Sequence, residues 1–213
     1  MSFQPSVPGK YSMRVRTERN MEIKGSPIQF TAKPMSKAWT FDPGTMQAGL
    51  ALSNSNKTVT NTIGGRKWPS VYGTTALKEG IHKWKVILPT TLPLDGQWVG
   101  LGVSPKPFQD FGSSVYKGLI GFSSNGYEWN GNGGYVARSL SWQGGDVIQM
   151  ELNCKSRTLA ETNLRTGISF SVTVPNQDLY PQFIIFTKNH SLTLQVEEDA
   201  DADVGQRPEC RQN

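Results

Sequence analysis

Cysteine and histidine are scarce in this chain of 213 residues, which has two of each. The cysteines are a poor disulfide pair, because Cys154 ends the apolar alternation "VIQMELNC" and Cys210 lies in a polar tail. No apolar run approaches the roughly 20 residues of a membrane span, and no N-terminal segment suits a signal peptide. We therefore expect an intracellular, cytoplasmic protein that does not enter a membrane.

Residue clusters suited to catalysis or metal binding are also missing. His190 has no nearby Asp, Glu or Cys at ligand-like spacing, and no nucleophile with an adjacent base can be proposed from His82 and His190. The acidic run "EEDADAD" lacks the glycine and the terminal glutamate of a calcium loop. The segment "SSNGYEWNGNGGY" lacks the Lys-Ser/Thr and the strand-to-helix context of a phosphate-binding loop, so turns are favoured there. The sequence predicts no enzymatic activity, no metal and no cofactor.

The net charge of +5 is unevenly distributed along the chain. Residues 1–37 carry seven Lys and Arg against two acids, whereas residues 197–213 carry two against six. The basic residues in between are scattered and form no stripe interleaved with aromatics, so nucleic-acid binding is not expected. We divide the chain into a basic N-terminal extension (1–37) with a short strand at "PIQFTA", a folded domain (38–197), and an acidic and mixed C-terminal tail (198–213).

Glycine and tryptophan are abundant, with 22 and 6 residues respectively. Between turn signals, short stretches with a period of two recur about every ten residues, which is the spacing of strands in an all-β sandwich. The clearest is "GISFSVTVP", where one side carries Ile168, Phe170, Val172 and Val174. The sequence predicts an all-β fold built as an antiparallel sandwich.

The stretch "EGIHKWKVIL" raises the question of whether His82 takes part in chemistry. Alternation puts His82, Trp84, Val86 and Leu88 on one face and Ile81, Lys83, Lys85 and Ile87 on the other. An apolar stripe opposite two lysines indicates a half-buried strand entered from a turn. A structural role for His82 is favoured over a catalytic one.

Glycines alternate with aliphatic residues in "QWVGLGVS". Trp98, Gly100 and Gly102 share one face of this strand, and the glycines leave room for something large to pack over it. A sandwich this rich in glycine needs rings to fill its interior. Of the aromatic residues in or beside turns, we therefore expect about half to be core or loop-anchoring residues rather than binding residues, Trp129 and Trp142 most of all.

Six segments occur in an order that resembles a SPRY domain. They are "LALSNSNKTVT", "WPSVYGTTALKEGIHKWKVIL", "GQWVGLGVS", "YKGLIGFSSNGYEWNG", "GDVIQMELNCKSRTLA" and "LYPQFIIF", and the match runs from about Trp39 to Val196. The resemblance implies a bent antiparallel β-sandwich of the concanavalin-like jelly-roll type, no enzymatic activity, and binding of protein segments by loops at one edge. It also implies that His82 and Trp84 belong to a fold-defining strand.

Four loops match the binding edge of that family by their order: "NSNKT", "RKWPSVYG", "FGSSVYKG" and "TKNHS". In the branch that binds Asn-rich peptides and recruits ubiquitin ligase machinery, a pocket tyrosine matches Tyr116, whereas that branch's tryptophan after the "LYP" strand corresponds to Thr187 here. The predicted partner-binding residues are Arg66, Lys67, Trp68, Tyr72, Tyr116, Thr187, Lys188 and Asn189. Their rings and donors suit an acidic or amide-rich segment. The second candidate place is the loop between Tyr127 and Tyr135.

Two functions remain open. The first is a non-catalytic protein–protein interaction module that binds a peptide or protein partner, in narrower form a substrate-recruiting adaptor. The second is a lectin-like carbohydrate-binding sandwich, because aromatic and Asn-rich loops also suit sugars. The lack of a secretion signal and of a metal cluster favours the first.

Overall fold

The computed structural model describes residues 9–13, 28–32, 39–63, 68–92, 98–105, 118–140 and 142–196. The chain divides into two compact units, one formed by Met1–Lys37 with Glu198–Asn213 and the other by Ala38–Glu197. In the first unit, β1 (Gly9–Met13) pairs antiparallel with β2 (Ile28–Ala32). The short strand expected at "PIQFTA" is confirmed as β2, and β1 is its unforeseen partner.

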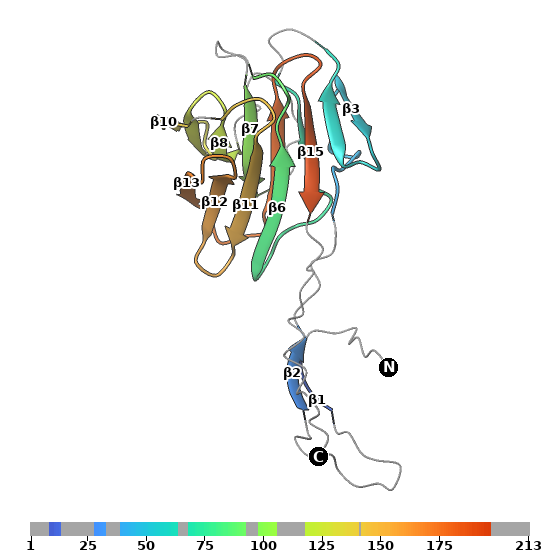
Figure 1. Cartoon of the computed structure of the whole chain (residues 1–213), viewed down its shortest axis with the longest axis vertical. Helices are drawn as coiled ribbons and strands as arrows, with labels where there is room; N and C mark the ends of the chain where they lie inside the picture. Colours follow the sequence, from blue (N-terminus) through green and yellow to red (C-terminus); the bar gives the residue numbers. More distant parts are fainter. Residues whose placement is uncertain are drawn as a thin grey trace, which may run out of the picture. The chain divides into compact units, whose positions relative to one another are not determined.

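The second unit consists of two antiparallel sheets, which confirms the predicted β-sandwich (Figure 1). The six-stranded sheet has the order β10 (Tyr135–Ala137), β9 (Tyr127–Asn130), β8 (Ile120–Ser123), β7 (Val99–Ser104), β14 (Tyr180–Ile185) and β5 (Ser70–Tyr72). The seven-stranded sheet has the order β13 (Ser169–Thr173), β12 (Thr158–Asn163), β11 (Val147–Asn153), β6 (Ile81–Ile87), β15 (Ser191–Val196), β4 (Thr58–Asn61) and β3 (Leu50–Ser53). The described residues include no helix with the length and hydrophobicity of a membrane span.

Strand β6 lies in the middle of the seven-stranded sheet and contains His82. Trp84, Val86 and Leu88 are buried and His82 is half-buried on the same side, whereas Lys83 is exposed on the other side. His82 pairs with Leu152 of β11. The expected half-buried strand is confirmed, and His82 is one of its paired residues.

Turns in the seven-stranded sheet follow the local chemistry of their residues. Strands β3 and β4 are joined through Asn54, Ser55 and Asn56, all with positive φ, a conformation that asparagine tolerates well. Between β11 and β12, Asn153 Oδ1 accepts hydrogen bonds from the N–H groups of Lys155 and Ser156, both at 3.0 Å. A short polar side chain that binds its own backbone stabilises such a turn.

The main core fills the space between the sheets. Its buried rings include Trp39, Trp84 and Phe183. Trp39 packs edge-on against Trp84, with the ring centroids 5.7 Å apart. Trp142 also belongs to this core at 8% exposure, as predicted. Because this core covers the inner face of each sheet, only the outer faces, the edges and the loops are available to bind other molecules.

The six-stranded sheet is buried on both faces at its centre. Every residue of β7 is buried, with Leu101 in the main core and Gly100 on the opposite face. A Cβ atom added at Gly100 would lie 3.0 Å from Trp98 Cζ3 and 3.1 Å from Leu119 Cδ2. The prediction that large groups pack over the glycines of "QWVGLGVS" is confirmed, and the covering groups include an indole.

Strand register defines two ends of the six-stranded sheet. At the first, Val99 pairs with Ile185, and we call it the Val99 end. At the second, Ser104 pairs with Tyr180, and we call it the Ser104 end. Loops that leave the sheet at different ends cannot contribute to one small site, because β7 separates the ends by six residues, roughly 20 Å of strand.

Candidate functional site

Aromatic side chains form a continuous row over the outer face of the six-stranded sheet. Trp68 lies between Phe186 and Trp98, with ring centroids 6.0 and 6.1 Å away. Trp98 stacks on Trp129 at 5.8 Å with an interplanar angle of 22°. Strand β9 supplies Trp129, whereas Phe186 directly follows β14, Trp98 directly precedes β7 and Trp68 lies two residues before β5. The sheet therefore fixes the spacing of the rings.

Two tyrosines extend the row toward the sheet edge. Tyr135 of β10 lies 5.2 Å from the Trp129 ring and 4.6 Å from the Tyr127 ring. Tyr127 and Trp129 are two residues apart in β9 and therefore point to the same face. Tyr135 is 58% exposed, so the row ends in a ring that is open to solvent.

Buried contacts hold the centre of the row in place. Trp98 and Trp129 are 6% and 5% exposed and pack with the fully buried Leu119 and Ile184. The Trp129 indole N–H donates to Ser123 Oγ at 2.8 Å. Ser123 Oγ in turn donates to Asn125 Oδ1 at 2.6 Å, which fixes the amide next to the rings. The rings and the amide are thus positioned before any ligand arrives.

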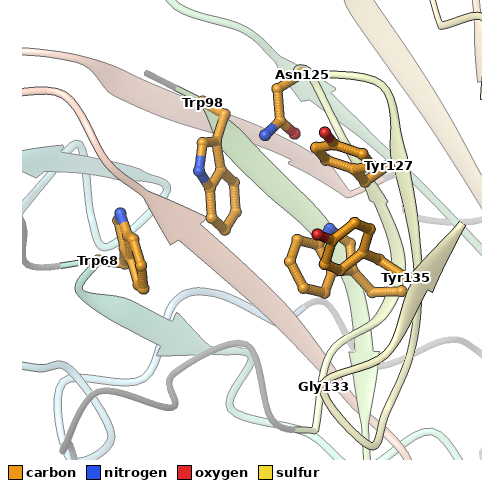
Figure 2. Close-up of a pocket in the computed structure, with 7 residues that line it drawn as sticks. Trp68, Trp98, Asn125, Tyr127, Gly133 and Tyr135 are labelled. Carbon is orange, nitrogen blue, oxygen red and sulfur yellow. The ribbon is translucent and has the colours of Figure 1, made fainter. Parts of the chain in front are cut away.

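A pocket of about 270 Å³ opens among these side chains (Figure 2). The indoles of Trp68 and Trp98 stand on one side of it and the phenols of Tyr127 and Tyr135 on the other (Figure 2). We call it the aromatic pocket, and its lining is Trp68, Trp98, Asn125, Tyr127, Trp129, Gly133 and Tyr135. Its shape suits a single side chain or a small ring system rather than a long rigid ligand.

The aromatic pocket is uncharged. Its lining contains no Asp, Glu, His, Lys or Arg, and its polar side-chain groups are the Asn125 amide, the tyrosine hydroxyls and the indole N–H groups. Glu128 lies between Tyr127 and Trp129 in β9, so its side chain points to the opposite face, where it pairs with Arg138 at 2.7 Å. The exposed Lys188 lies two residues beyond Phe186, on the turn that follows the row.

The predicted site residues have different outcomes. Trp68 lines the aromatic pocket, and Thr187, Lys188 and Asn189 form the turn that follows Phe186 at the Val99 end of the sheet. Tyr72 is fully buried, so the expectation that its ring contributes to a binding surface is wrong. Strand β5 spans three residues, all of them buried, too short for its sequence to show which are covered. Arg66, Lys67 and Tyr116 lie outside the described residues.

The structure does not gather the four predicted loops at one edge. Trp68 and the turn after Phe186 lie at the Val99 end, since the Phe186 N–H donates to the Trp98 carbonyl at 3.0 Å. The turn of "NSNKT" lies toward the Ser104 end, since the Phe41 N–H donates to the Asn56 carbonyl and Phe41 bridges to Gly73 beside Pro181. A single site at one sheet end therefore contains Trp68 and residues 187–189 without the "NSNKT" turn.

Trp98 and Asn125 are pocket residues that the sequence did not assign to the site. The signal for Trp98 was its place on the glycine face of "QWVGLGVS", which marked the face as covered rather than as part of a site. The prediction that Trp129 is buried is confirmed, and this ring also forms the back of the pocket. The Tyr127–Tyr135 loop, the second candidate place, supplies three of the pocket's rings.

The titratable side chains of the described residues form no cluster that could bind a metal ion. No group of three or more His, Cys, Asp and Glu side chains in these residues could hold a metal ion. His190 is buried, and its Nε2 lies 3.4 Å from Thr91 Oγ1. Burial lowers the pKa of His190 below its usual value, so its imidazole is neutral at physiological pH.

Comparison with known proteins gives structural likenesses without sequence matches. No protein-family model matches the chain, and no curated protein matches its sequence. The SPRY domain of human HERC1 is 18% identical over 74% of this chain and 98% of that one, with a TM-score of 0.61. The PSpry domain of TRIM65 is 22% identical over 76% and 93%, with a TM-score of 0.57. Stonustoxin is 19% identical over 74% of this chain and 27% of that one, with a TM-score of 0.57. At these identities the likeness concerns the fold, where it confirms the resemblance that the motifs indicated.

Proposed function

We propose that this chain, whose Ala38–Glu197 unit has the SPRY fold, is a non-catalytic protein-interaction module that binds a segment of a protein partner in the aromatic pocket. The observation that carries the proposal is the row of rings that ends in an open, uncharged pocket. Pockets lined mainly by aromatic groups with a few fixed polar atoms are typical binding sites. Nothing in the pocket's lining could act as a nucleophile with an adjacent base.

The burial of the rings favours tight binding of a small anchor. Trp98 and Trp129 are held by the sheet, so binding costs little side-chain entropy at the back of the pocket. Tyr135 at the rim is exposed and loses its contact with water when a partner covers it. Large rings in such a setting are common hot spots of protein interfaces.

The partner's anchor should be an apolar or aromatic side chain next to acidic or amide residues. An uncharged aromatic pocket favours the apolar anchor. Lys188 and Asn189 on the nearby turn, with Arg66 and Lys67 just before Trp68 in the sequence, would supply donors to the acidic or amide residues. Thr187, on the same turn, remains part of the predicted contact set. Tyr116 stays a separate prediction, because β7 ends and β8 begins at the Ser104 end of the sheet.

A carbohydrate is the competing ligand. Sugars also stack on exposed rings and hydrogen-bond to amides, and Asn125 beside Tyr127 and Tyr135 provides this combination. A substrate-recruiting adaptor of a ubiquitin ligase assembly is a narrower form of the favoured function. Ligase subunits recovered with the full chain and identified by mass spectrometry would support that narrower role.

The deciding experiment is a random-peptide display selection on the full chain, run beside a glycan array. We expect an enriched peptide with an apolar anchor and acidic or amide neighbours, and Tyr135→Ala should weaken its binding by about 1–3 kcal/mol in titration calorimetry. Tyr180→Ala is the matched control, because Tyr180 is a half-buried ring at the Ser104 end, outside the pocket.

Three results would count against this placement. Enrichment on the glycan array alone would support the lectin-like function. Loss of peptide binding in Tyr116→Ala with full binding in Tyr135→Ala would move the site to the Tyr116 segment. Equal weakening by Tyr135→Ala and Tyr180→Ala would show a general loss of stability, which a parallel melting curve would detect.

A further inference from the structure

Strand β10 forms one edge of the six-stranded sheet, next to the aromatic pocket. It has three residues, Tyr135, Val136 and Ala137, and all three are exposed. Tyr135 and Val136 are 58% and 54% exposed, and the strand carries no charged side chain. Natural sheet edges are usually protected by charges, prolines or bulges, because an open edge is a template for another strand.

The hydrogen-bond pattern shows which backbone groups of β10 face outward. The Asn130 N–H donates to the Gly134 carbonyl at 3.2 Å and the Arg138 N–H to the Gly126 carbonyl at 2.7 Å. In an antiparallel ladder the bonded pairs alternate, so the bonded residue of β10 between these two points is Val136. The N–H and C=O groups of Tyr135 and Ala137 therefore point away from β9, and within the described residues they have no hydrogen-bond partner.

We propose that an extended peptide segment of the partner pairs with the edge of β10 as an added strand. The inference rests on the proposed function, since the same segment places its anchor in the aromatic pocket. Two N–H and two C=O groups, on Tyr135 and Ala137, form the main-chain contact. Tyr135 belongs to both features, because its backbone faces the edge while its ring lines the pocket.

The side chains of β10 indicate what the added strand should carry. Tyr135 and Ala137 share the pocket face, and Val136 lies on the other face. Pairs of aromatic or β-branched residues on neighbouring strands stabilise a sheet. The partner segment should therefore have such residues at successive positions, with the anchor on the pocket face.

Strand β13, an edge of the other sheet, lacks these additional contacts. Its ladder to β12 bonds through Phe170 and Val172, so Ser169, Ser171 and Thr173 present the outward groups. On one face a strand added there would meet the small polar side chains of Ser169, Ser171 and Thr173, and on neither face would it meet the pocket rings. A second copy of this chain is a weaker occupant for β10, because three residues offer little main-chain contact for a dimer without an anchor in the pocket.

The experiment measures amide hydrogen exchange of the full chain with and without the tightest peptide from the display selection. We expect the amides of Tyr135 and Ala137 to become protected, whereas the Val136 amide is protected in both states. Ala137→Pro removes an outward donor at an edge position that tolerates proline, and it should weaken the peptide by about 3- to 10-fold. Ser171→Pro makes the same change at an outward position of the edge strand β13, away from the pocket, and serves as the control, with binding unchanged.

The outcomes separate this inference from the proposed function. If Tyr135→Ala weakens the peptide while the Tyr135 and Ala137 amides stay unprotected and Ala137→Pro binds normally, strand addition is wrong and the pocket site stands. If the display selection yields no peptide, both are wrong. Protection of these amides without peptide, rising with protein concentration, would identify a second copy as the occupant. Should Ala137→Pro fail to fold, the exchange of the unmodified chain still decides.

Discussion

Glu161 places a carboxyl group between the two sheets. It is 3% exposed, and neither carboxyl oxygen makes a hydrogen bond of normal geometry. The facing residue is Gly121, where an added Cβ would lie 2.9 Å from Oε1. Burial raises the pKa of Glu161 well above its usual value, and the backbone of Phe122 offsets only part of that rise.

The raised pKa makes stability depend on pH in a defined direction. The folded state favours the protonated form of Glu161, so the contribution of this group is complete below the pKa of the unfolded chain and is lost as pH rises through the folded pKa. Glu161→Gln should raise the free energy of unfolding by about 1–3 kcal/mol at pH 8 and by little at pH 4. Urea denaturation at both pH values measures this. Glu151→Gln, at a half-exposed position, is the control and should show no such gain.

His82 and Trp84 lie on the same side of β6 and differ in burial, since His82 is half-buried and Trp84 is fully buried. Trp84 is fully buried against Trp39, so Trp84→Ala should lower the free energy of unfolding by about 3–5 kcal/mol. His82→Gln keeps the strand and should leave both the melting temperature and peptide binding nearly unchanged. Loss of binding in His82→Gln with an unchanged melting curve would contradict the structural role of this histidine.

At the scale of the strand, β7 and β8 approach closely where Gly102 of β7 pairs with Gly121 of β8. A Cβ on Gly102 would lie 2.3 Å from the Ile120 carbonyl oxygen, a backbone atom that cannot move aside. At Gly100 the nearest atoms to the added Cβ belong to the side chains of Trp98 and Leu119, at 3.0 and 3.1 Å, with Ile184 Cβ at 3.5 Å. The two positions therefore differ in how well the neighbours can adjust.

This difference predicts unequal effects of the same substitution. Gly102→Ala should cost about 3 kcal/mol or more in unfolding free energy, and Gly100→Ala about 1 kcal/mol. Thermal and urea denaturation of both variants would measure the costs. Equal costs would mean that β7 shifts as a whole to make room.

Strands with one buried face could be predicted from the sequence, and strands with two could be predicted only in part. In β6, lysines alternate with Trp84 and Val86, so period two assigned the faces correctly. In β7 both faces are buried, and nothing local distinguishes an inner Leu101 from an outer Trp98. The prediction that Tyr72 contributes to a binding surface was wrong because β5 has only three residues, all buried, and so shows no alternation.

The assembly of the pocket depends on pairing between distant segments, which alternation does not encode. Trp68 meets Trp98 because β5 and β7 both pair with β14. The family resemblance gave the order of loops, and loop order alone does not tell which sheet end each loop leaves. Strand register therefore had to come from the structure.

At the scale of the whole molecule, Ala38–Glu197 forms a unit with its own core. We expect a fragment of residues 38–197 to fold alone and to melt at the temperature of the full chain. Limited proteolysis should trim both ends and leave this fragment resistant. Early cleavage within residues 80–155 would mean that the boundaries are wrong.

Stacking of Trp98 on Trp129, with Trp68 beside them, has an optical consequence. Indoles this close couple their electronic transitions, which gives a circular dichroism signal that isolated tryptophans lack. Trp39 and Trp84 lie in the other core and contribute a constant background. A molecule that enters the aromatic pocket would alter the coupled circular dichroism signal and the fluorescence emission of these tryptophans. Binding can therefore be followed without an added label.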